Sequence, residues 1–90
     1  LRDEAHMRIY PNPSEGNQVR LELTNLESET GIATLLVLDM TGKQVYTERI
    51  PAKGDQLNTV LDFKPALTSG MYFISIELDG IIYREKFIVK

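Results

Sequence analysis

The chain of 90 residues contains no cysteine, no tryptophan and a single histidine. Without cysteine it can form no disulfide, no thiolate metal site and no cysteine nucleophile. The one histidine, His6, lies near the start of the chain, so a Ser-His-Asp arrangement or a multi-histidine metal site has too little support. We therefore expect no enzymatic activity and no cofactor, and a surface or structural place for His6.

The chain also lacks an excess of positive charge and long apolar segments. Ten Lys and Arg residues stand against 13 Asp and Glu residues, giving a net charge of −3, which argues against a nucleic-acid partner. The longest apolar run, Leu35 to Leu38, is far shorter than the roughly 20 residues of a membrane helix. We expect no membrane insertion. No leader peptide is visible before the first strand, and the stretch reads as a piece of a longer protein.

Four aspartates lie at or near expected turns and raise the alternative of a calcium site, because loop carboxylates and backbone oxygens are its usual ligands. None of the four stands in a D-x-D-x-D-G spacing, so turn capping is the better interpretation, although a metal in a loop stays open. These residues are Asp39, Asp55, Asp62 and Asp79.

Alternation of apolar and polar residues is the main pattern that the chain does have. From Tyr72 to Leu78 every second residue is apolar, as in a half-buried strand. Asp79-Gly80 then fits a two-residue type I′ turn, so residues 81–89 should return antiparallel. In this last strand we assign four residues to the core and expect Ile82 and Ile88 to face outward. The four are Ile81, Tyr83, Phe87 and Val89.

Similar patterns upstream, separated by turn residues, predict five further strands and no convincing helix. Seven short strands favour an all-β fold, an antiparallel sandwich of immunoglobulin-like type. The apolar run in residues 32–40 places that strand in the middle of the sandwich. Residues 1–5 read as a linker remnant, residues 6–90 as one domain and residues 27–31 as a turn. The other expected strands are residues 6–10, 19–24, 44–50 and 57–63.

Seven aromatic residues could form a sugar-stacking surface, but four of them fall on positions assigned to the core. Packing is therefore favoured over carbohydrate binding. The residues are Tyr10, Tyr46, Phe63, Tyr72, Phe73, Tyr83 and Phe87.

Three groups of motifs occur in a fixed order along the chain. The first is Tyr10-Pro11-Asn12-Pro13, and the second is D-x-x-G-K at Asp39, Gly42 and Lys43. The third is L-x-x-G-x-Y at Leu67, Gly70 and Tyr72, followed by a terminal strand flanked by lysines. That strand end reads Lys86, Phe87, Ile88, Val89 and Lys90. Taken together, residues 7–90 resemble the type A C-terminal sorting domain of the type IX (Por) secretion system of Bacteroidetes.

The resemblance implies a seven-stranded sandwich that is not itself an enzyme. Such domains direct an N-terminal cargo protein from the periplasm across the outer membrane to the cell surface, and a sortase-like peptidase commonly removes them. The expected partners are therefore an outer-membrane translocon and that peptidase. Exposed edge strands would also permit a weak homodimer. The alternative is a carbohydrate- or protein-binding sandwich of an extracellular enzyme or adhesin.

Within this interpretation the motif residues divide into recognition and scaffold. The terminal segment from Lys86 to Lys90 is the candidate for translocon recognition, because a strand at a chain end exposes backbone groups for strand addition. Pro11 and Pro13 should end the first strand. Asp39 and Gly42 should fix the central hairpin, and Gly70 should allow the bend through which Tyr72 enters the core.

Overall fold

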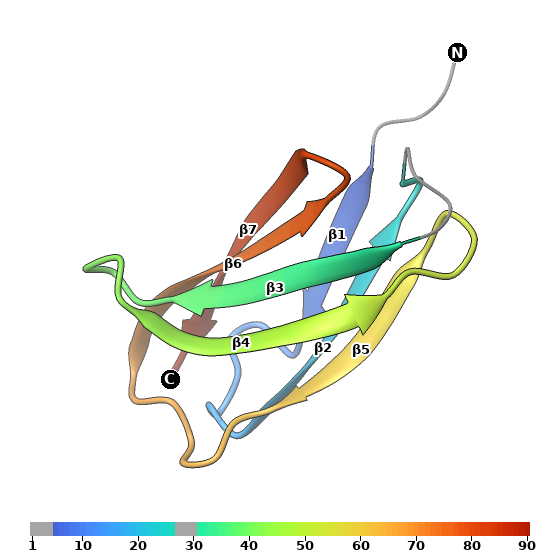
Figure 1. Ribbon diagram of the computed structural model, residues 1–90. Coiled ribbons are helices and arrows are strands. Elements are labelled where there is room, and N and C mark those ends of the chain that lie inside the picture. The colour runs from blue at the N-terminus through green and yellow to red at the C-terminus, as the bar shows by residue number, and fades with distance from the viewer. Residues whose placement is uncertain (1–4, 27–30) are drawn as a thin grey trace.

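The alternation in the sequence corresponds to seven antiparallel strands in two packed sheets (Figure 1). The computed structural model describes residues 5–26 and 31–90. One sheet has three strands in the order β1-β2-β5, and the other has four in the order β4-β3-β6-β7. The strands are β1 (His6–Tyr10), β2 (Gln18–Thr24), β3 (Ile32–Leu38), β4 (Gln44–Pro51), β5 (Leu57–Asp62), β6 (Gly70–Leu78) and β7 (Ile81–Val89).

The core lies between the sheets and is built by the residues of alternate parity. In β2, Val19, Leu21 and Leu23 are buried, whereas their neighbours Arg20 and Glu22 face water. The inward residues of β3 and β6 are buried in the same way. They are Ala33, Leu35, Val37, Tyr72, Ile74, Ile76 and Leu78. An all-β sandwich with this core confirms the predicted fold class.

The last hairpin also follows the prediction. Asp79 and Gly80 have φ values of 52° and 80°, and Leu78 pairs directly with Ile81 across the turn. Both turn residues therefore lie in the left-handed region that a type I′ loop requires. Phe87 and Val89 are buried, Ile81 and Tyr83 are half-buried, and Ile82 and Ile88 are 57% and 45% exposed, so the facing is confirmed and the core assignment holds fully for two of the four residues.

The strand partition differs from that of an immunoglobulin constant domain. That topology places the fourth strand in the sheet of the first, second and fifth strands. Here β4 pairs with β3 in the four-stranded sheet instead. A tight hairpin explains the pairing, because residues 39–43 turn β3 directly back into β4.

β3 occupies an interior position in its sheet, between β4 and β6, as its apolar composition predicted. A strand that is apolar on both faces would be expected to have both faces covered. The outward face of β3 is not covered, because Leu36 and Leu38 are only half-buried and Ile32 is 56% exposed. The strand itself ends at Leu38, because Asp39 and Met40 already belong to the turn. An exposed apolar surface therefore remains on the four-stranded sheet.

Two expected segments fall mostly outside the described residues. They are the linker at 1–5 and the turn at 27–31, of which residues 1–4 and 27–30 are not described. Within the described part of the chain, no helix is long and apolar enough to cross a membrane.

Candidate functional site

The up-and-down course of the strands brings all the sequence motifs to one end of the sandwich. β1, β3, β5 and β7 all run toward this end, which therefore carries the loops 11–17, 39–43 and 63–69 and Lys90; the 39–43 hairpin projects apart from the other two loops (Figure 1). We call these loops together with Lys90 the motif end. β1 begins at His6, at the opposite end, which also carries the Asp79-Gly80 turn (Figure 1). A protein fused ahead of β1 would therefore leave the motif end accessible.

Hydrogen bonds to the backbone and to the Asn12 side chain tie the end of β7 to the loop that follows β1. The Ile88 N–H donates to Asn12 Oδ1 at 3.0 Å, and the Ser14 N–H donates to the Ile88 carbonyl at 2.8 Å. The Lys90 N–H then donates to the Ser14 carbonyl at 2.9 Å, which completes a short parallel pairing of Ser14 with Val89. The P-N-P motif and the terminal strand, 76 residues apart in the chain, thus form one unit.

The third motif joins this unit through Gly16. The Leu67 N–H donates to the Gly16 carbonyl at 2.8 Å. Gly16 has φ of +89°, and a Cβ placed on it would lie 2.4 Å from the Leu67 carbonyl oxygen and 2.9 Å from Val89 Cγ1. Only glycine allows the two loops and the terminal strand to approach this closely.

These bonds correct the expectation that the terminal residues offer free backbone groups. The outward N–H and C=O of Ile88 and the N–H of Lys90 already have partners within the domain. Backbone groups of every second strand residue point to the same side, so those of Ile82, Arg84 and Lys86 also face away from β6. Of these three, Lys86 lines a groove of about 440 Å³ that separates the second half of β7 from β1, and its N–H donates to Glu85 Oε1 at 3.0 Å. The outward backbone groups of Ile82 and Arg84 lie upstream of these bonds.

The side chains of the terminal segment are divided between core and surface. Phe87 is fully buried, with its ring stacked 5.6 Å from Tyr72 and 6.4 Å from Phe63, and Val89 is 3% exposed. Lys86, Ile88 and Lys90 are exposed. Of the five residues predicted as the recognition segment, a partner of the folded domain can therefore touch only these three side chains.

The D-x-x-G-K motif forms the hairpin loop between β3 and β4. Asp39 Oδ1 accepts hydrogen bonds from Thr41 Oγ1 at 2.6 Å and from the N–H groups of Thr41 and Lys43 at 2.9 and 3.0 Å. These bonds, led by that from the Thr41 hydroxyl, hold the pKa of Asp39 below its ordinary value. Gly42, at φ +88°, closes the turn by donating to the Asp39 carbonyl. The predicted structural role of Asp39 and Gly42 is present.

The L-x-x-G-x-Y motif starts β6. Gly70 has φ of +150°, and two residues later Tyr72 enters the core with 5% exposure. The Tyr72 hydroxyl donates to the Thr68 carbonyl at 2.7 Å, four residues upstream. A tyrosine near the start of the sixth strand that bonds back to the preceding corner is also a feature of immunoglobulin-like sandwiches. It fixes the 63–69 loop against the core.

The gathered motifs agree with a comparison against known families. The family model of secretion system C-terminal sorting domains matches residues 8–90, nearly the whole chain. The chain belongs to this family. The domain therefore directs secretion of a cargo protein through the type IX system, which implies export across the outer membrane. A search of curated proteins finds no match. Members of the family are sorting signals and not catalysts.

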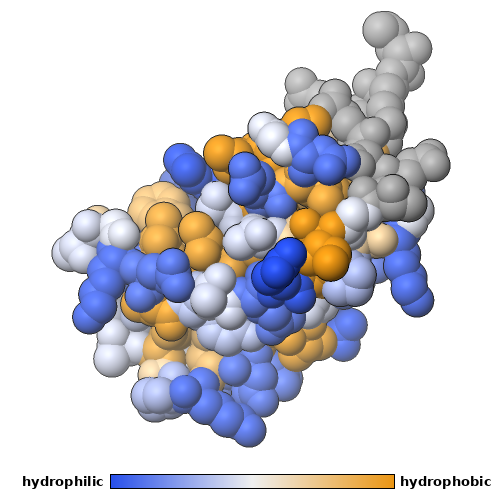
Figure 2. All heavy atoms as spheres, viewed as in Figure 1, coloured by the Kyte–Doolittle hydropathy of each residue, from blue (hydrophilic) through white to orange (hydrophobic). Residues whose placement is uncertain are grey.

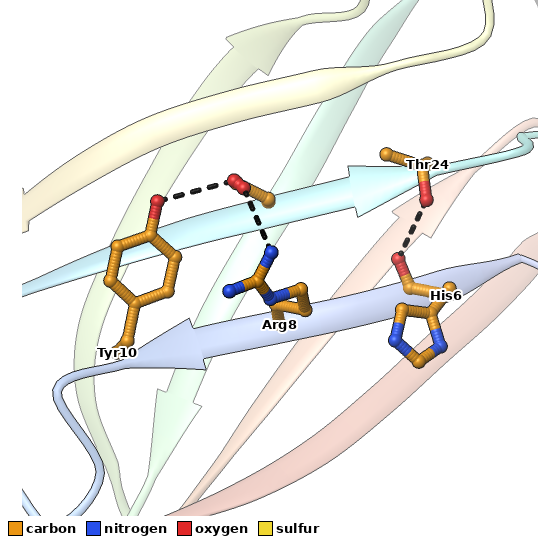
Figure 3. A network of polar contacts seen from close by, with 5 residues as sticks. His6, Arg8, Tyr10 and Thr24 are labelled. Atoms are coloured by element: carbon orange, nitrogen blue, oxygen red, sulfur yellow. Dashed lines mark hydrogen bonds and ion pairs between the residues drawn. The ribbon is translucent and has the colours of Figure 1, made fainter.

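The side chains that could take part in catalysis or metal binding, such as His6 and Tyr46, make ordinary structural contacts in this sorting domain. His6 is exposed on β1, where its carbonyl accepts from Thr24 Oγ1 at 3.4 Å (Figure 3). Burial and a hydrogen bond to Glu48 raise the pKa of Tyr46 to about 12, so this phenol stays protonated at neutral pH. Among residues 5–26 and 31–90, no three His, Cys, Asp or Glu side chains are close enough to hold a metal ion.

Four of the seven aromatic residues of the sorting domain form one chain of ring contacts. Tyr46 meets Phe63 edge-on at 5.2 Å, and Phe63 continues the stack through Phe87 to Tyr72. Three of these four rings are buried, so they cannot stack on a sugar. The interpretation as core packing is confirmed for them.

No role was assigned from the sequence to two important residues of the motif end, which lie between the P-N-P motif and β2. Ser14 is fully buried and pairs with the terminal strand, and Gly16 allows the close approach to Leu67 and Val89. Both lie immediately after P-N-P, but a loop has no periodicity that marks long-range contacts. Of the two residues, only Gly16 is of a type that suggests a special backbone conformation, and a glycine is compatible with any turn.

Proposed function

We propose that the export machinery binds the folded sorting domain at its motif end, through the exposed residues of the terminal strand. The observation that carries this proposal is the hydrogen bonding of Asn12 and Ser14 to Ile88 and Lys90. These bonds hold the strand end in one conformation, so little conformational entropy is lost when a partner binds it. Lys86 and Lys90 add two positive charges at fixed places beside Ile88.

The family resemblance supplies the wider course of events in this proposal. The type A sorting domain passes from the periplasm through an outer-membrane translocon, and a sortase-like peptidase then removes it from the cargo at the cell surface. The terminal segment serves the recognition step, and the scaffold residues keep it in place. The open edges of β1 and β7 also permit a weak homodimer by strand pairing.

A matched pair of charge variants tests the recognition step. A fluorescent reporter would carry residues 1–90 at its C-terminus in a bacterium with the type IX system. Lys86→Gln with Lys90→Gln removes two exposed charges at the terminal strand, and Arg20→Gln with Lys53→Gln removes two exposed charges elsewhere. We expect the first variant to accumulate in the periplasm and the second to reach the surface.

Thermal unfolding of both fusions would show that the domains are folded. All four side chains are exposed, so neither pair should lower stability by more than about 0.5 kcal/mol. Equal export of the two folded variants would contradict the proposed role of the terminal lysines. A wild-type fusion that remains in the periplasm would contradict the sorting function itself.

A further inference from the structure

The two outer faces of the sandwich differ in their side chains. On the three-stranded sheet the outward positions are almost all polar, and Arg8, Tyr10 and Glu22 form a surface network there (Figure 3). This is the usual condition of an antiparallel sheet with one face in water. The outward residues are His6, Arg8, Tyr10, Gln18, Arg20, Glu22, Thr24, Asn58, Val60 and Asp62.

On the four-stranded sheet a continuous set of outward apolar residues crosses three strands. Leu36 and Leu38 are neighbours on one side of β3, and Leu38 pairs directly with Phe73 of β6. Two residues before Phe73, Met71 pairs with Ile88 of β7. Directly opposed residues on one face touch, so the five form one surface, which we call the outer band.

The band is accessible to a partner, and part of it is hollow. Its residues are half-buried apart from Ile88, which is exposed. Leu38 and Phe73 line a hollow of about 250 Å³ together with Met40, Arg84 and the Asp39-Gly42 turn. Met40 is 70% exposed. Figure 2, which looks onto this sheet, shows exposed hydrophobic residues between charged ones. Both outer faces meet solvent, so contact with water does not explain why one is polar and the other carries an apolar patch.

The charges around the band are mostly positive, although the chain has a net charge of −3. Arg49 on β4 and Arg84 and Lys86 on β7 face outward here, against Glu77 on β6; Glu85 of β7 is also exposed, but it has the opposite parity and its carboxylate accepts from the Lys86 N–H. In the adjoining 39–43 loop, Asp39 and Lys43 cancel. The face as a whole therefore complements an acidic surface.

The geometry points to the outer band as the docking surface for a protein of the export machinery, one that presents acidic residues around an apolar patch. This inference rests on the proposed function and extends it from the terminal strand to the sheet face. A second copy docked through the same face would bring Arg84 and Lys86 near their own counterparts. A lipid surface is also a poorer partner. This face has three cations and one carboxylate, whereas lipid-binding clusters typically have four to eight basic residues.

Two double variants separate this surface from the rest of the molecule. Phe73→Thr with Arg84→Glu changes the band, and Val60→Thr with Arg20→Glu makes a similar change on the opposite outer face. In the reporter fusion, we expect export of the band variant to fall roughly tenfold, as when a central interface contact is lost. The control variant should be exported like the wild type. Arg84→Glu alone, which keeps Phe73 in place, is the test if the first double variant does not fold.

Each other outcome has a definite meaning. If the folded Arg84→Glu fusion is exported at the wild-type rate, the outer band is not the docking surface. Export of the wild-type fusion in the same experiment would still support the sorting function. A wild-type fusion left in the periplasm overturns both. The purified fusion would also be examined by sedimentation and with vesicles rich in anionic lipid. Self-association or vesicle binding that Arg84→Glu abolishes would replace the protein partner by a second copy or by a membrane, and would overturn the inference.

Discussion

At the scale of single residues, the motif end depends strongly on Gly16. The backbone at this position passes between the Leu67 carbonyl and the Val89 side chain, where no Cβ fits. The φ of +89° adds a second reason for glycine, because L-residues are strained in that region. One residue thus combines a conformational and a steric requirement in the loop that holds the terminal strand.

A comparison of two glycines tests this requirement. Gly16→Ala should destabilise the domain by at least about 2 kcal/mol, because backbone strain and a clash with the Leu67 carbonyl act together. Gly54 has φ of +62° and open space around its Cβ position, so Gly54→Ala should cost only about 1 kcal/mol of strain. Urea unfolding of both variants measures the two free energies. Equal losses would show that the close approach at Gly16 does not matter.

Single residues were also where the sequence was least informative. Asp39 and Gly42 were predicted because a turn requires them locally, and Gly70 and Tyr72 because they lie at the start of an alternating strand. Ser14 was not predicted, since its burial follows from pairing with Val89, 75 positions away in the chain. Local chemistry identifies residues whose role is local, and it cannot identify those whose partners lie in a distant strand.

At the scale of elements, β7 is both part of the core and the candidate recognition segment. Phe87 is fully buried against Tyr72 and Phe63, and Ile88 is exposed beside it. Removing residues 86–90 would therefore delete core packing together with the exposed lysines. A truncated domain that fails in export would not show which of the two was required, and point variants are the sharper test.

Two substitutions in β7 should separate these roles. Phe87→Ala should reduce the free energy of unfolding by about 3–5 kcal/mol, a large part of the stability of a small domain. Ile88→Thr should cost less than about 1 kcal/mol, because threonine suits a strand and the side chain faces water. Denaturant unfolding measures both values. Similar losses at the two positions would mean that the alternation of β7 is assigned wrongly.

Strand existence and facing could be predicted from the sequence because alternation has one period and a turn residue ends each run. The assignment of strands to sheets could not. Alternation shows which way a side chain points, whereas the position of β4 beside β3 depends on the hairpin between them. The same limit explains the terminal strand: its free edge was expected from its place at the chain end, but the 11–17 loop covers it.

At the scale of the whole molecule, the sandwich is polarised along its strands. The three motif loops and Lys90 lie at one end, while His6 and the turns at 52–56 and 79–80 lie at the other (Figure 1). A cargo attached before β1 would therefore join the domain at the end opposite the motif end. On the proposed function, the domain would present the same motif end to the machinery whatever protein precedes it.

The most direct test of this polarity is a pair of loop insertions. A flexible Gly-Ser segment of about ten residues would be placed between Pro65 and Ala66, at the motif end, or between Lys53 and Gly54, at the opposite end. All four residues are exposed, and lengthening a surface loop costs little free energy. Both fusions should therefore melt within about 5 °C of the wild type.

Export of the reporter to the cell surface is the measurement. The account predicts that the insertion between Lys53 and Gly54 leaves export near the wild-type level. The insertion between Pro65 and Ala66 should hold the folded fusion in the periplasm, because the added segment obstructs the surface that the machinery binds. Undiminished export with the insertion at 65–66, or a block caused by the one at 53–54, would contradict recognition at the motif end.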